Sequence, residues 1–143
     1  MNLLKRTVTA AVLLGVLFIV LQYAPGWAFF IFGEAFIIAA LLEFYSLTGK
    51  KGLKPHKILG ILLALLVGLA FYIRAIPLEA ALFGGLLIAG VYFVAAVDGP
   101  ETLAAFPASF AVTVLGVVYV SFTLGFLCRI RLEMGPFYLY FLF

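Results

Sequence analysis

Apolar residues run along this chain in blocks of about 20, the length that a helix needs to span roughly 30 Å of hydrocarbon. Short breaks with prolines, glycines and charged residues separate the blocks. They predict helices near residues 4–23, 27–47, 57–76, 78–97 and 107–128. A last apolar run, 137–143, rises only about 10 Å as a helix and stops without a polar end. We therefore expect residues 1–143 to form one all-α polytopic transmembrane bundle, with about five full spans and a truncated sixth.

Six prolines punctuate the sequence, each at or beside a break with a charged residue or a glycine. Proline lacks a backbone N–H and disrupts a helix interior, and lipid offers backbone groups no replacement partner. We therefore expect the helices to end at these breaks, with Pro107 opening the helix near 107–128.

The composition narrows the class of protein. The chain is 67% hydrophobic and 10% charged, whereas soluble domains carry about 25% charged residues. This excludes a cytosolic enzyme, a nucleic-acid-binding protein and a disordered tail. Cys128 and His56 are each the only residue of their type, which excludes an intrachain disulfide and a His-pair metal site.

The basic residues predict the orientation. If every helix crosses, six lie on one side (Lys5, Arg6, Lys50, Lys51, Lys54 and Lys57) and three lie in loops on the other (Arg74, Arg129 and Arg131). Because Lys and Arg collect in cytoplasmic loops, we expect a cytoplasmic N-terminus in a bacterial-type inner (cell) membrane. The first apolar run has no small-residue cleavage pattern, so we expect a retained helix rather than a signal peptide.

Small residues recur at helical spacing along four of the predicted helices. The stripes are Thr7/Ala11/Gly15, Gly60/Ala64/Gly68, Ala81/Gly85/Ala89 and Ser121/Gly125. Such stripes allow helix backbones to approach closely in lipid. They favour a compact bundle.

Glu34 is the most informative single residue, because it lies about one third of the way into the helix near 27–47. A carboxylate at that depth is costly and commonly faces a partner, a cavity or a translocation path. Proton relay or substrate coordination is one interpretation; a neutral carboxyl, or one near the membrane interface, is the other. Glu43 lies nine residues later, on the opposite helix face, so the two are not a paired-carboxylate site.

The segment from Lys50 to Lys57 is the only dense charge cluster. Its four lysines could hold a lipid headgroup or a nucleotide phosphate, or record only the topology. Arg74 and Glu79 flank Pro77, and we expect them to snorkel or to pair across that turn.

Other polar groups give no catalytic centre. The Asp98–Glu101 segment has the composition of a turn, although two carboxylates could also bind a cation. The aromatic residues of 137–143 suit a membrane interface or a binding site. The sequence contains no phosphate-cradling glycine loop, nucleophile elbow or acidic metal constellation.

Two stretches resemble a known family. The first joins the opening Lys-Arg-Thr-Val-Thr-Ala to Leu42–Leu47 (Leu-Glu-Phe-Tyr-Ser-Leu), the Lys/Gly/Pro loop and Gly60. The second contains 114–120 (Val-Leu-Gly-Val-Val-Tyr-Val), 124–127 (Leu-Gly-Phe-Leu), Arg129-Ile-Arg131 and Gly135. In order and spacing they resemble the N-terminal half of phosphatidate cytidylyltransferase, also called CDP-diacylglycerol synthase.

The resemblance implies a role in phospholipid biosynthesis. That family condenses CTP with phosphatidic acid, forms CDP-diacylglycerol and pyrophosphate, and requires Mg²⁺. Its Ser-Pro-Lys-Lys-Thr-like stretch and its Lys-Asp…His-Gly-Gly…Asp-Arg signature do not occur here. The resemblance therefore implies the N-terminal membrane portion of the enzyme, with no catalytic residue or metal ligand and no activity of its own.

Two other classes stay open. A small proton-coupled transporter would use Glu34, and a structural membrane subunit would dock a larger partner through its small-residue stripes, Gly85 among them. In every case we expect membrane lipids as partners, and self-association into a homo-oligomer stays open.

Overall fold

The computed structural model describes residues 8, 15–16, 19–20, 22–135 and 138. Within these residues the chain forms helices and no strand. The elements are α2 (Gly26–Lys50), α3 (Lys57–Tyr72), α4 (Leu78–Ala95), α5 (Pro100–Gly116), the π-helix η1 (Val117–Phe122) and α6 (Thr123–Glu133). Most of the predicted helix near 4–23 and nearly all of the partial helix 137–143 lie outside the described residues.

Three helical segments are long and apolar enough to cross a membrane: Gly26–Lys50, Leu78–Ala95 and Pro100–Glu133. The helix Lys57–Tyr72 is apolar but shorter, with 16 residues. It ends four residues before the predicted bound of 76. The described part of the chain is thus a helical bundle of the kind that integral membrane proteins form.

The predicted helix near 107–128 was too short at both ends. The structure has one continuous helical segment from Pro100 to Glu133, and Pro107 lies inside α5 rather than at a helix start. Proline removes one backbone hydrogen bond, and membrane helices tolerate that loss when their surroundings satisfy the freed group. Arg129 and Arg131, expected in a loop, lie in α6, where basic residues near a helix C-terminus complement the helix dipole.

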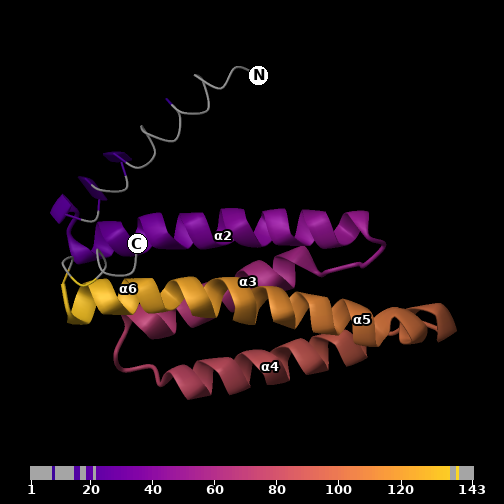
Figure 1. The fold of residues 1–143 in the computed structure, drawn as a ribbon. Helices are drawn as coiled ribbons and strands as arrows, with labels where there is room; N and C mark the ends of the chain where they lie inside the picture. Colours follow the sequence, from indigo (N-terminus) through magenta and orange to yellow (C-terminus); the bar gives the residue numbers. More distant parts are fainter. Residues whose placement is uncertain (1–7, 9–14, 17–18, 21, 136–137, 139–143) are drawn as a thin grey trace.

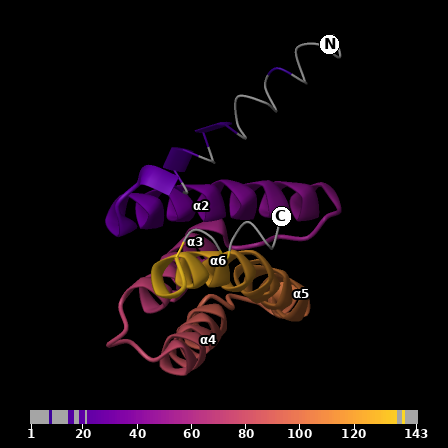
Figure 2. The ribbon, with the colours of Figure 1, turned by 60° about the vertical axis from the view of Figure 1, so that its left-hand side comes forward.

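The bundle has α3 at its centre. Helices α2 and α4 lie on opposite sides of a layer formed by α3 and the α5–η1–α6 segment (Figures 1 and 2). Accordingly, α3 contacts α2, α4, α5, η1 and α6. The labelled helices α2 to α6 run roughly along one direction (Figure 1), as expected for a bundle in a bilayer.

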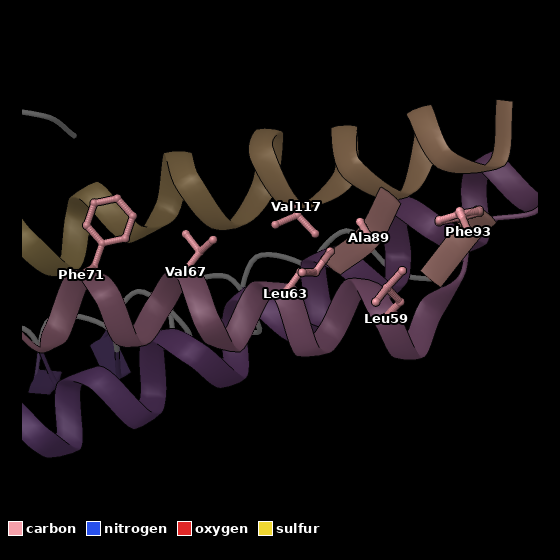
Figure 3. Close-up of a cluster of buried hydrophobic side chains, with 7 residues drawn as sticks. All are labelled: Leu59, Leu63, Val67, Phe71, Ala89, Phe93 and Val117. Carbon is pink, nitrogen blue, oxygen red and sulfur yellow. The ribbon is translucent and has the colours of Figure 1, made fainter. Parts of the chain in front are cut away.

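Apolar side chains fill the space between α3, α4 and η1. Figure 3 shows the main cluster, which consists of Leu59, Leu63, Val67, Phe71, Ala89, Phe93 and Val117. The four residues from α3 follow one another at intervals of four, so they lie along one helix face. This face is directed toward the α5–η1–α6 segment (Figure 3).

Small residues allow the helices to approach closely, as the stripes predict. A Cβ atom at Gly60 or Gly116 would overlap the Tyr45 ring, and one at Gly125 would overlap the Phe71 ring. Four further members of the stripes are also buried, namely Ala64, Ala81, Ala89 and Ser121. The stripe Thr7/Ala11/Gly15 lies outside the described residues except for Gly15.

Candidate functional site

Glu34 lies inside the bundle. It is only 6% exposed and shares the buried face of α2 with Ile37, Leu41 and Tyr45. These positions are three, seven and eleven residues apart from Glu34, the spacing of one helix face. The carboxylate lies against Gly68 of α3, where a Cβ atom would collide with Oε1. The missing side chain of Gly68 therefore leaves the space that Glu34 occupies.

The Glu34 carboxylate is not fully satisfied. Its Oε2 atom is buried and has no hydrogen-bond partner, and no ion pair to Glu34 occurs among the described residues. On the same stretch of α2, Gly33 lies close to the Cys128 thiol of α6. Most buried polar atoms in proteins have partners, so an unpartnered carboxylate oxygen identifies Glu34 as a candidate functional residue.

Glu34 and Glu43 lie on different faces of α2. Glu43 is exposed whereas Glu34 is buried, in agreement with the rotation of about 100° per residue. The two carboxylates therefore do not form an acid–base pair.

A second polar junction, which the sequence did not reveal, lies where α2 meets α5. The Tyr45 hydroxyl donates a hydrogen bond of 2.7 Å to the Thr113 carbonyl. The Thr113 hydroxyl donates to the Ser109 carbonyl over 2.7 Å and accepts the His56 backbone N–H over 3.0 Å. This network joins α2, the α2–α3 loop and α5. Of the residues in this network, the sequence alone singles out only Tyr45, because Tyr45 belongs to the Glu-Phe-Tyr segment.

His56 directly precedes α3, and its ring lies among aromatic side chains. The Tyr92 hydroxyl lies 3.3 Å from His56 Nδ1, and the Phe93 ring meets the imidazole edge-on at a centroid distance of 4.7 Å. The sole histidine of the sequence thus holds the loop against α4.

The four predicted lysines lie together at one end of the bundle. Lys50 ends α2, Lys51 and Lys54 lie in the loop, and Lys57 begins α3. All four are exposed, and within the described residues none forms an ion pair. The arrangement presents four ammonium groups to the surroundings and suits either a headgroup contact or a topology signal.

At the end of the bundle opposite the four lysines, the charged side chains form other ion pairs than the sequence predicts. Arg74 does not pair with Glu79 across the turn; its Nη2 atom lies 4.0 Å from Glu133 Oε1. Arg129 Nε donates to the same oxygen over 3.1 Å. The sequence could not show this pairing, because Glu133 lies far from Arg74 along the chain and the two meet only when α6 packs beside the end of α3.

The Asp98–Glu101 segment is the start of a helix. The Thr102 hydroxyl accepts the backbone N–H groups of Asp98 and Gly99 over 3.1 and 3.0 Å, and it donates to the Gly99 carbonyl over 2.8 Å. These bonds satisfy N–H groups that a helix start would leave unpaired. The segment therefore leads into α5 and is not an isolated turn.

The described residues hold no group of three or more His, Cys, Asp and Glu side chains that could bind a metal ion. Ser121 Oγ in η1 is a further buried polar atom without a partner.

Comparisons of the chain with protein-family models, curated proteins and solved structures find no match.

Proposed function

We propose that this chain is the N-terminal membrane portion of an enzyme that resembles phosphatidate cytidylyltransferase. The enzyme would condense CTP with phosphatidic acid to CDP-diacylglycerol and pyrophosphate, a step of phospholipid biosynthesis. This portion would serve as scaffold and as the surface that contacts lipid. The Mg²⁺ ligands and the nucleotidyl-transfer residues would belong to the other half of the enzyme.

One observation supports this proposal. The residues that carry the resemblance come from separate stretches of sequence, yet three of them meet at one place. The Tyr45 ring, from the Glu-Phe-Tyr segment, lies against Gly60, which follows the loop, and against Gly116 of the Leu-Gly-x-x-Tyr segment. A chance likeness spread over apolar helices gives no reason for these residues to touch. Their contact is expected if the motif specifies one packing unit.

The proposed orientation also uses the arrangement of charges. Lys50, Lys51, Lys54 and Lys57 lie at the end of the bundle formed by the α2–α3 loop, whereas Arg74, Arg129 and Arg131 lie toward the opposite end. The excess of basic residues at the loop end supports a cytoplasmic N-terminus in a bacterial-type inner membrane. Five full spans and part of a sixth remain our proposal for the whole chain.

The gene sequence beyond codon 143 tests the family directly. We expect a further helix, the Ser-Pro-Lys-Lys-Thr-like stretch and the Lys-Asp…His-Gly-Gly…Asp-Arg signature. A reading frame without that signature would overturn the proposal.

An activity assay tests the reaction. Membranes from cells that express the whole reading frame are given labelled CTP, phosphatidic acid and Mg²⁺, and we expect labelled CDP-diacylglycerol. Membranes with residues 1–143 alone serve as the matched control and should form none, because nucleotidyl transfer needs metal-held phosphates. Product from residues 1–143 alone, or none from the whole frame, contradicts the proposal.

A second function, proton-coupled transport, is favoured by one specific observation, the buried and unpartnered oxygen of Glu34. Ionisable residues within membrane helices commonly mark proton paths. In proteoliposomes with a pH-sensitive dye inside, Glu34→Gln should abolish proton-linked transport, whereas Glu43→Gln on the exposed face should not. Absence of proton flux with the unmodified chain would exclude this function.

A further inference from the structure

We infer that a phospholipid with a zwitterionic headgroup binds at the end of the bundle where α3 turns into α4. Two adjoining cavities form the site. One is polar and lies at the helix ends, and the other is apolar and runs beside α4. This inference does not depend on the proposed enzyme function, because it rests only on cavities and charges at the end of the bundle opposite the lysine loop.

The polar cavity has a volume of about 400 Å³, and its lining includes Arg74, Glu79, Arg129 and Glu133. Both guanidinium groups approach one carboxylate oxygen, Glu133 Oε1, at 4.0 Å for Arg74 and 3.1 Å for Arg129. A guanidinium carries five N–H donors in a planar fork. These contacts use few of them, so both arginines retain donors for a phosphate group.

The apolar cavity has a volume of about 340 Å³ and is lined by α3, α4 and η1, including Val67, Leu82, Leu86 and Val118. Gly85 of α4 also lines it, and a Cβ atom at this position would lie 3.3 Å from Leu63 Cδ2. Leu86 is 45% exposed and Val118 is 44% exposed, so the groove opens on the outside of the bundle. In a membrane this outside face meets acyl chains.

Glu79, at the start of α4, lines both cavities and therefore marks where they meet. The polar part lies at the helix ends, where lipid headgroups are found, and the apolar part lies along the helices at the depth of the hydrocarbon. A ligand that fills both must be polar at one end and carry a chain at the other. A phospholipid taken from the bilayer has this shape.

The charges of the polar cavity select the kind of headgroup. Two arginines and two glutamates line it, so the four charges sum to zero. A headgroup with a phosphate and an ammonium group complements both signs, with the phosphate at Arg74 and Arg129 and the ammonium at Glu79. A headgroup with a phosphate but no ammonium group, such as that of phosphatidylglycerol, would leave Glu79 without a positive partner.

Lipid titration followed by native mass spectrometry tests the site. The purified, delipidated chain of residues 1–143 is titrated with phosphatidylethanolamine, phosphatidylglycerol and diacylglycerol that carry identical acyl chains. We expect phosphatidylethanolamine to bind about tenfold more tightly than diacylglycerol, the difference that one charge-assisted hydrogen bond produces. Equal binding of all three lipids, or binding of phosphatidylglycerol as tight as that of phosphatidylethanolamine, overturns the proposal.

Variants separate the two cavities. The double substitution Arg74→Gln and Arg129→Gln should reduce phosphatidylethanolamine binding to the level of diacylglycerol. Leu86→Trp should weaken both lipids by filling the groove. Leu87→Trp is the matched control, because Leu87 is the next residue, 69% exposed, and is not part of the groove.

Each outcome is decisive when helicity and elution volume show that the variants fold. If Leu86→Trp and Leu87→Trp have the same effect, the lipid binds the general surface and the proposal is wrong. Loss of this lipid site would leave the cytidylyltransferase assay of the whole enzyme as an independent test of the proposed function.

Discussion

Two side chains of α2, Tyr45 and Glu34, enter the bundle in the same way but end in different surroundings. Each lies against a glycine of α3, Tyr45 against Gly60 and Glu34 against Gly68. The Tyr45 hydroxyl reaches the Thr113 carbonyl at 2.7 Å, whereas Glu34 Oε2 is buried without a partner. The same arrangement of a side chain against a glycine thus contains one hydrogen-bonded group, the Tyr45 hydroxyl, and one buried oxygen without a partner, Glu34 Oε2. Packing alone does not explain the second.

The largest expected effect compares the two glycines. Gly60→Ala should destabilise the bundle by about 1–3 kcal/mol, because a methyl group there overpacks the core against the rigid Tyr45 ring. Gly68→Ala should cost less, because the group it meets is the end of a flexible Glu34 side chain. The free energy of unfolding, followed by circular dichroism in mixed micelles titrated with denaturing detergent, measures both. Equal losses would show that the two sites are not packed differently.

The next effect concerns the polar network around Tyr45. Thr113→Val should cost about 1–2 kcal/mol, because the His56 N–H loses its acceptor but is only half-buried. Thr48→Val is the matched control, since the Thr48 hydroxyl bonds only to carbonyls of its own helix, those of Phe44 and Tyr45. The same unfolding titration measures both variants. If Thr48→Val lowers the free energy of unfolding as much as Thr113→Val does, the network around Tyr45 contributes no more than a hydrogen bond within one helix.

A smaller loss is expected for Tyr45→Phe, which keeps the ring and removes one hydrogen bond worth about 1 kcal/mol. The Thr113 carbonyl still accepts the backbone N–H of Val117, so it is not left unpaired. Tyr119→Phe on the exposed surface should change nothing measurable. A Tyr45→Phe variant as stable as the unmodified chain would show that the Tyr45 hydroxyl, like the Glu34 carboxylate, does not stabilise the bundle.

The smallest effect, and the one of opposite sign, belongs to Glu34. Replacing a buried polar group that lacks a partner by an apolar one of similar size is commonly neutral or stabilising. Glu34→Leu should therefore leave the free energy of unfolding unchanged or increase it, with the exposed Glu43→Leu as control. Destabilisation by more than about 1 kcal/mol, the typical worth of a hydrogen bond, would reveal a structural role for the carboxylate and erase the contrast with Tyr45.

Much of the fold followed from the sequence because length and apolarity decide what spans a bilayer. The predicted helices 27–47 and 78–97 agree closely with α2 (Gly26–Lys50) and α4 (Leu78–Ala95). The same pattern could not reveal η1, because a π-helix and an α-helix of apolar residues share one hydrophobic signal. Pro107 was misleading, since a proline in a membrane helix does not have to end it.

The candidate sites were predictable only in part. The burial of Glu34 follows from its position among apolar residues of α2, but its lack of a partner depends on Gly68 and on what α6 presents. The convergence of Arg74 and Arg129 on Glu133 depends on two helix ends meeting in space. The sequence suggested Glu79 as the partner of Arg74 instead, because a sequence shows only which residues are neighbours along the chain.

The continuous helical segment from Pro100 to Glu133 has a consequence for the surrounding membrane. Its uncharged part between Glu101 and Arg129 has 27 residues and extends about 40 Å as a helix, against roughly 30 Å of hydrocarbon. Figure 1 shows α5 reaching past the end of α4. Such hydrophobic mismatch is relieved by tilt or by local thickening of the bilayer. Bilayer thickness should therefore change the angle of this one helix more than that of the 16-residue α3.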